Sequence, residues 1–213
     1  MQNKWENETK VQTRARWDKD ISINGKFNTK VQYSYPFDEN SLIFDVGGYK
    51  GGWARYADEI WNCNIFIFEP VTEFYNYCVN RFKNKNKIKI FKYGLEDEEK
   101  QVEISSGGCG SSTYRITKNM QTIQIKSISN VINNELNIKS IDLLKLNIEG
   151  GEYKLLDDLD SSNLLKNIKY LQIQFHKDMD KDGKKREKAL KIISKTHKID
   201  NMYKWAWAFF SLR

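Results

Sequence analysis

Residues 42–52 read LIFDVGGYKGG, an apolar run followed at once by a glycine-rich turn. The apolar run, Leu42 to Val46, has the composition of a strand that is buried on both faces of a parallel sheet. A second such run follows at Ile65 to Phe68. Between the two runs, large and apolar side chains recur at helical spacing, at Trp53, Tyr56, Ala57 and Ile60. The sequence therefore predicts a strand, a glycine turn, a helix and a second strand over residues 41–70.

The end of the second strand places a carboxylate near this turn. Glu69 follows Asp45 by twenty-four positions, close to the offset at which nucleotide-binding βαβ units hold ribose hydroxyls. Pro70 favours extended geometry for Glu69, which keeps it at the carboxyl edge of the sheet. Glycines in the turn let the backbone pass close under a ligand. We therefore predict a site for a nucleoside-type cofactor, with a tight connection that binds no ligand as the alternative interpretation.

The turn does not have the spacing of a dinucleotide-binding fingerprint. Its glycines are spaced as Gly47-x-x-x-Gly51, and the acidic Asp45 precedes them. A pyrophosphate binds helix N–H groups and is repelled by a nearby anion. The pattern instead suits a cofactor with a cationic amino-acid end.

Composition points to one domain. The chain has 213 residues, of which 39% are hydrophobic and 30% charged, enough to bury a substantial core. No apolar run has the roughly 20 residues of a membrane helix, and the first residues lack a secretory pattern, so we expect a cytoplasmic protein without a membrane partner. Three separated cysteines and two histidines argue against a metal site.

Residues 1–40 are polar with scattered aromatic side chains. We expect this N-terminal segment to cover the core or to act as a lid over the cofactor, with the main domain spanning residues 41–213.

The net charge is +7, and lysines cluster at residues 83–92 and 177–198. Such a basic face binds nucleic acid or a phosphorylated small molecule, or is simply solvated. We expect a solvated face and no nucleic-acid partner.

Further elements follow along the chain. We expect a helix over Val71–Phe82 with Val71, Tyr75, Cys78 and Phe82 on one face, a strand over residues 88–93, and a turn at 94–97 that flanks an adenine.

Residues 101–104 and 122–126 read as antiparallel strands. The Ser- and Gly-rich loop 105–113 between them is either an ordinary surface loop or a flap that closes over the site. Cys109 in this loop is interpreted as incidental, because no histidine neighbours it in sequence.

A second glycine turn follows the apolar strand predicted at residues 141–146. Asn147, Glu149 and Glu152 flank Gly150 and Gly151, at the same sheet edge as the first turn. These polar groups either contact the ligand or cap the following helix. The chain continues with a strand at 170–175 that ends at His176, a helix over 182–198, and an antiparallel edge strand at 203–210.

Taken together, these pieces resemble the FkbM-type methyltransferases, within the class I S-adenosylmethionine (SAM) enzymes. The resemblance covers roughly residues 40–176 and rests on Asp45-Val46-Gly47 with Gly51, on Glu69-Pro70, on the Gly94 turn, on the Ser-Gly loop at 105–113 and on the stretch from Leu144 to Glu152. The stretch from Gln172 to His176 also resembles one branch of the family. It implies an α/β, Rossmann-like fold with a mostly parallel seven-stranded sheet, helices on both faces and an antiparallel last strand. Two departures are visible: Gly48-Tyr49 stands where the family commonly has Ala-Asn, and Asn147 replaces the usual aspartate.

The resemblance implies SAM as cofactor and methyl transfer to a hydroxyl of a sugar, which could be nucleotide-linked, or of another small molecule. An RNA methyltransferase and a non-catalytic module with the same fold are the alternatives, and a homo-oligomer is left open. The predicted cofactor-binding residues are Asp45, Gly47, Gly48, Tyr49, Gly51, Glu69, Pro70, Gly94, Leu95 and Asn147. The predicted catalytic residues are His176, which could activate the acceptor hydroxyl, with Glu149, Glu152 and Asn147 as rivals or helpers.

Overall fold

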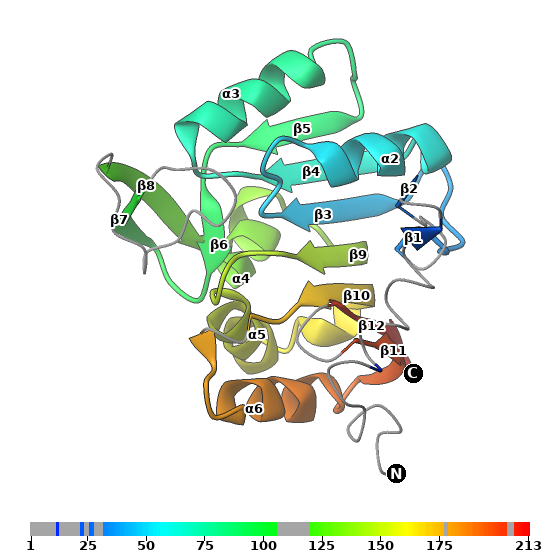
Figure 1. Cartoon of the computed structure of the whole chain (residues 1–213), viewed down its shortest axis with the longest axis vertical. Helices are drawn as coiled ribbons and strands as arrows, with labels where there is room; N and C mark the ends of the chain where they lie inside the picture. The colour runs from blue at the N-terminus through cyan, green and yellow to red at the C-terminus, as the bar shows by residue number, and fades with distance from the viewer. Residues whose placement is uncertain are drawn as a thin grey trace.

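We describe the protein from a computed structural model, which covers Gln12 and residues 22–23, 26–27, 32–105, 120–176, 179–203 and 207–213. A seven-stranded sheet forms its centre (Figure 1). In chain order the elements are β1 (Ser22–Ile23), β2 (Lys26–Phe27), β3 (Leu42–Val46), α2 (Gly52–Trp61), β4 (Asn64–Phe68), α3 (Thr72–Arg81), β5 (Ile88–Phe91), β6 (Gly94–Glu96), β7 (Lys100–Ser105), β8 (Met120–Ser127), α4 (Ile128–Asn130), η1 (Val131–Glu135), β9 (Ile141–Leu146), α5 (Glu152–Ser161), η2 (Leu165–Asn167), β10 (Ile168–Gln174), α6 (Lys184–Ile193), β11 (His197–Met202) and β12 (Trp207–Leu212).

The sheet has the strand order β11-β12-β10-β9-β3-β4-β5. Strands β5, β4, β3, β9 and β10 pair in parallel, so their carboxyl ends meet at one edge. The last strand, β12, runs antiparallel to both of its neighbours, β10 and β11. The mostly parallel seven-stranded sheet with an antiparallel last strand is therefore confirmed.

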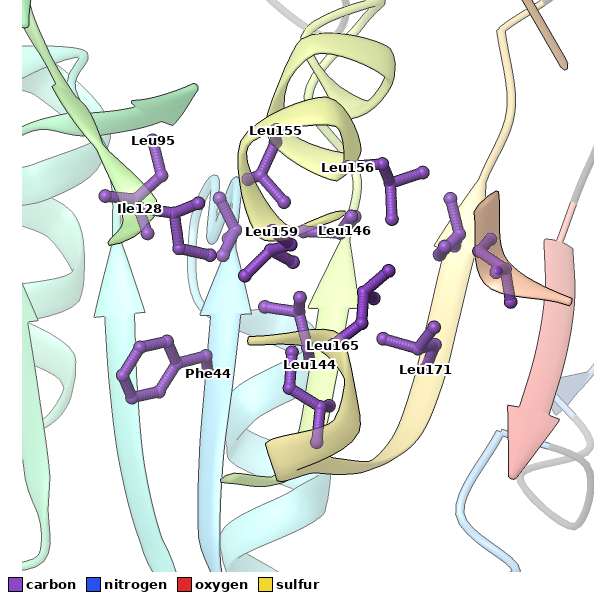
Figure 2. Packing of buried hydrophobic residues seen from close by; sticks show 14 of the residues in the cluster. Phe44, Leu95, Ile128, Leu144, Leu146, Leu155, Leu156, Leu159, Leu165 and Leu171 are labelled. Atoms are coloured by element: carbon purple, nitrogen blue, oxygen red, sulfur yellow. The ribbon is translucent and has the colours of Figure 1, made fainter. Parts of the chain in front are cut away.

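Alternation along each central strand sends side chains into two cores, one on each face of the sheet. Ile43 and Leu143 face the core under α2 and α3, whereas Phe44 and Leu144 face the core under α5 and α6. Figure 2 shows the second of these cores, in which leucines of α5 pack onto β3 and β9. All four strand residues are fully buried. Both faces of the strands therefore have to be apolar, which is why these strands read as continuous apolar runs.

A smaller three-stranded sheet, in the order β6-β8-β7, projects beyond the carboxyl edge of the main sheet (Figure 1). The expected antiparallel pair is present as β7 and β8. Residues 94–97 were expected to form a turn, and this prediction is wrong. Gly94 to Glu96 instead form β6, which pairs in parallel with β8, and a Cβ at Gly94 would lie 2.7 Å from Ile125 of that strand.

Helix α2 uses a different face from the one expected, whereas the expected face of the α3 region is confirmed at Val71, Cys78 and Phe82 and differs at Tyr75. Helix α2 buries Ala54, Ala57, Asp58 and Trp61, while Tyr56 and Ile60 are exposed. The small alanines allow the helix to lie close to the sheet, and Tyr56 and Ile60 lie on its outer face. In α3 the buried aromatic residue is Phe74, and Tyr75 is only half-buried. Phe74 reaches a small apolar cluster with residues of β7 and β8, a contact that the local sequence does not encode.

The C-terminal region also differs from expectation. The helix predicted over 182–198 ends at Ile193, and His197 begins the strand β11. His197 is buried and its Nε2 lies 2.8 Å from the carbonyl oxygen of Ile168, so it belongs to the sheet. The final strand is not at the edge, because β12 lies between β10 and β11.

Most of the N-terminal segment, including Trp5, Trp17 and Phe27, lies outside the residues whose side chains are described. Within residues 32–40, Tyr33 is buried and stacks on Trp53 of α2 at 5.3 Å, while Phe37 contacts Trp61 at 4.9 Å. A cover or a lid formed by residues 1–40 stays a prediction. In the part of the chain that is described, no helix combines the length and the apolar character of a membrane span. A cytoplasmic location also stays a prediction.

Candidate active site

A cavity of about 730 Å³ opens at the carboxyl edge of the central strands. Its volume lies in the range of about 300–1,000 Å³ that is usual for small-molecule sites. The strand-end turns, the small β6-β8-β7 sheet and helices α5 and α6 all contribute to its wall. Eight of the predicted site residues line it, namely Gly47, Tyr49, Glu69, Pro70, Gly94, Leu95, Asn147 and Glu149. The two glycine turns are thus brought together, as expected for the carboxyl edge of an open α/β sheet.

Glu69 is the most constrained acidic group in the cavity wall. Its side chain is almost fully buried at the end of β4. One carboxylate oxygen accepts the backbone N–H of Tyr49 at 2.7 Å, and the other accepts that of Val71 at 2.9 Å. Burial raises the pKa of Glu69 to about 7, and these two hydrogen bonds only partly offset that effect. The group is therefore poised between its neutral and charged forms near neutral pH.

The first turn is shaped by close backbone contacts. Gly47 has a φ of +79°, and a Cβ there would overlap the carbonyl oxygen of Asn147 in the second turn. Gly47 therefore lets the two turns meet at the cavity wall. Gly51 has a φ of +67° and faces away from the cavity, where a Cβ would lie 2.6 Å from the Phe82 ring. Gly48 likewise packs on Ile67. Gly48 and Gly51 serve packing within the unit, and of these three glycines Gly47 lines the cavity; its close approach to a ligand stays a prediction.

An apolar wall faces these turns. Tyr49 packs edge-on against Phe74 at 4.3 Å. Around them lie side chains from the start of α3 and from the β7–β8 hairpin, namely Val71, Val102, Ile104, Ile123 and Ile125. This wall lies beside Gly94 and Leu95, where the adenine was expected. A flat aromatic base fits such a surface, because burying it removes apolar area from water.

The second turn holds the remaining predicted groups. Glu149 lines the cavity in a left-handed backbone conformation, with a φ of 50°. Such a conformation costs a non-glycine residue on the order of 1–3 kcal/mol and is concentrated at functional sites. Asn147 also lines the cavity, and its side-chain oxygen is buried without a hydrogen-bond partner among the described residues. A polar atom left in this state suits a ligand that donates a hydrogen bond.

Two predicted catalytic residues lie behind this turn, outside the lining of the cavity. Glu152 is fully buried and accepts the backbone N–H groups of Gly150 at 2.7 Å and of His176 at 3.2 Å. The same carboxylate lies 3.2 Å from His176 Nδ1, and His176 Nε2 lies 3.6 Å from Glu149. A carboxylate accepts only, so Nδ1 carries the proton and Nε2 is directed toward Glu149. Glu152 thus orients His176, and Glu149 is the member that reaches the cavity.

Asp45 does not line the cavity. It is fully buried in β3, and its Oδ1 lies 2.6 Å from Nζ of Lys145 in β9. Burial raises the pKa of Asp45, and Lys145 opposes that shift. The direct contact with the cationic end of a cofactor that its position suggested is therefore not available in this structure. Lys145 was missed as a site residue, although a lone lysine inside the run Leu143-Leu144-Lys145-Leu146 is a visible signal.

Some predictions lie outside the described residues. The loop 105–113, including Cys109, belongs to this group apart from the backbone of Ser105, and so does Trp205. Across the described ranges, no set of three or more His, Cys, Asp or Glu side chains is arranged to hold a metal ion. The acceptor and the oligomeric state stay predictions.

Comparisons with known proteins agree with the fold. The family model described as Methyltransferase FkbM domain matches residues 45–205. Curated proteins gave no match. Among solved structures, the precorrin-6y C5,15-methyltransferase from Geobacter metallireducens has a TM-score of 0.50 at 9% identity, over 90% of each chain. A chain of a fibrillarin/Nop5p complex has a TM-score of 0.51 at 10% identity, over 83% of this chain and 74% of that one. An rRNA methylase from Streptococcus thermophilus has a TM-score of 0.48 at 9% identity, over 97% and 99%. At these identities the likeness concerns the fold alone.

Proposed function

Because this chain belongs to the FkbM methyltransferase domain family, we propose that it uses SAM to methylate a hydroxyl group of a sugar or another small molecule. The observation that carries the proposal is the buried Glu69 carboxylate, which joins the end of β4 to the backbone of the glycine turn through Tyr49. A ribose bound there would give this carboxylate two hydroxyl donors. The cofactor's amino-acid end would then lie over Gly47, and its adenine on the apolar wall beside Leu95.

The residues present fit such a cofactor. The meeting of Gly47 and Asn147 leaves no room for a side chain in the turn. The unpartnered Asn147 oxygen offers an acceptor to the ammonium group or to a hydroxyl. Bound SAM supplies an activated methyl group on a sulfonium. What the protein adds is alignment of an acceptor oxygen with that methyl.

We place the acceptor hydroxyl beside Glu149. As the oxygen gains the methyl group, its proton passes to the pair formed by Glu149 and His176 Nε2, while Glu152 holds the imidazole through Nδ1. A positioned base of this kind contributes typically 10²–10⁴-fold to the rate. Glu152 acts as a positioning residue, because it is fully buried and does not itself line the cavity.

A small acceptor is favoured over RNA by the placement of the lysines. Lys83, Lys85 and Lys87 precede β5, and the start of β5 lies at the opposite edge of the sheet from the carboxyl ends of the parallel strands (Figure 1). Lys85 is paired with Asp58 at 2.7 Å. Near the cavity, Lys188 of α6 is paired with Asp157 at 2.6 Å. Pairing reduces the charge available for phosphate contacts, which dominate nucleic-acid affinity.

Calorimetry with SAM and with its demethylated product tests the cofactor assignment directly. Mass spectrometry of hydroxyl-bearing candidates, including free and nucleotide-linked sugars, then tests the acceptor by a mass gain of one methylene unit. Transcribed RNA serves as the competing substrate. No measurable binding of either cofactor form would refute the proposal, and methylation of RNA alone would replace the acceptor class.

A further inference from the structure

Two opposite charges lie inside the apolar centre of the sheet. Lys145 is only 3% exposed and Asp45 is not exposed at all. They are direct neighbours in the parallel pairing of β3 and β9, with Lys145 Nζ 2.6 Å from Asp45 Oδ1. The residues beside them in the two strands, including Val46 and Leu146, are apolar and fully buried. The pair is therefore an exception within the core.

Stability alone does not account for this exception. Removing two charges from water is costly, and an apolar pair of similar size is often equally or more stabilising. The pair is also incompletely satisfied, since Asp45 Oδ2 has no hydrogen-bond partner among the residues described. A buried polar group in this condition lowers stability. We therefore expect the pair to have a structural role that apolar side chains could not fill.

A second contact of the ammonium group supplies such a role. Lys145 Nζ also donates to the carbonyl oxygen of Gly47 at 2.9 Å. The N–H of Gly47 donates to the carbonyl oxygen of Phe68 at 3.0 Å. The peptide groups on either side of this left-handed glycine are thus fixed from both neighbouring strands, β9 and β4. Two residues later, Glu69 fixes the N–H of Tyr49.

We propose that Lys145 is a positioning residue for the cofactor-binding turn. Its ammonium group holds the Gly47 carbonyl and so sets the turn in the conformation that faces the cavity, while Asp45 keeps the ammonium group in place. This inference rests on the proposed SAM site. The role of Asp45 is then indirect, exerted through Lys145 and the backbone of the turn.

The test separates positioning from stability. The double variant Asp45→Leu/Lys145→Met removes both charges and keeps the core apolar. We expect its melting temperature to stay near that of the wild type and its Kd for SAM to rise about tenfold or more, the scale of one lost hydrogen bond to a charged group. Lys169→Met is the matched control. It removes another lysine–aspartate contact between strands, to Asp142 at 2.7 Å, far from the turn, and should leave the Kd unchanged.

The single variant Asp45→Asn adds a graded comparison. Its amide oxygen can still accept from Lys145, so SAM affinity should fall less than in the double variant. An equal loss in both would assign the effect to Asp45 itself and overturn the proposal. A folded double variant that binds SAM like the wild type would also overturn the proposal. If that variant does not fold, Asp45→Asn/Lys145→Gln, a neutral polar pair without the ammonium, carries the same prediction. Absence of SAM binding to the wild type would instead refute the proposed function.

Discussion

The protonation of Glu69 should make cofactor binding depend on pH. Its pKa is raised to about 7 by burial, whereas ribose hydroxyls and the two backbone N–H groups all donate and therefore favour the charged form. Only the charged fraction is then competent to bind. For a pKa of about 7 this fraction is roughly one-tenth at pH 6 and nine-tenths at pH 8. The apparent Kd for SAM should fall about tenfold over that interval.

Isothermal titration calorimetry at several pH values measures this dependence, and buffers of different ionisation enthalpy report the proton released on binding. Glu69→Gln is the matched control, because it keeps the shape of the side chain and cannot titrate. The α-amino group of the cofactor titrates near pH 8, but it does so equally in both proteins. The difference between the two profiles therefore isolates Glu69. Parallel profiles, or no proton release at pH 7, would refute the reasoning.

The same raised pKa has a consequence for stability. A carboxyl whose folded pKa exceeds its unfolded value of 4.5 binds more protons in the folded state between about pH 4.5 and 7. The contribution of Glu69 to the free energy of unfolding is therefore full below pH 4.5 and is lost as the pH rises toward 7. Its upper limit is about 3 kcal/mol. Bound SAM should reverse this trend near pH 7, because it stabilises the charged form.

Other variants address the remaining groups. Glu69→Ala should weaken SAM binding by about 1.5–3 kcal/mol in calorimetry; unchanged affinity would remove the ribose assignment. Gly51→Val should lower the melting temperature in a thermal scan, because its side chain meets Phe82 at a positive φ; a variant as stable as the wild type would contradict this packing role. His176→Gln should lower kcat by about 100-fold or more with SAM affinity retained, and near wild-type turnover would leave Glu149 or alignment alone as the source of rate. Burial lowers the pKa of His197, so its contribution to stability should be lost as the pH falls below about 6.5. His197→Gln should reduce this acid sensitivity in melting curves, and equal sensitivity in both proteins would point to other groups.

The parts of the fold that could be predicted are those with a local signal. β3, β4 and β9 are buried on both faces, so their apolar runs are unambiguous, and glycines mark the turns that follow them. The end of α6 and the start of β11 were missed because residues 194–198 carry no glycine or proline. The strand character of β11 depends on its pairing with β12, which residues 194–198 do not encode by themselves.

The candidate site likewise has some features with a local sequence signal and others that depend on distant parts of the fold. The spacing of Glu69 identified its place at the sheet edge, but its charge state depends on burial by distant elements. Glu149 and Glu152 look equivalent in sequence, three residues apart. The structure separates them, because the backbone reverses at Gly150, with a φ of +108°, and sends one to the cavity and the other into the core. The Lys145 contact with Gly47 depends on the register of two strands 100 residues apart, which the local pattern does not specify.

The position of β12 imposes an order on folding. Among the strands that the structure describes, β11 pairs with β12 alone, although it precedes β12 in the chain. Strand β11 therefore joins the sheet only through β12, once residues 207–212 lie beside β10. The pairing of β12 with β10 joins residues as far apart as Tyr170 and Ser211, and such non-local pairing is slower than local contacts and leaves strand edges exposed meanwhile. The parallel half of the sheet can assemble earlier, so the glycine turns form before the far edge of the molecule is sealed.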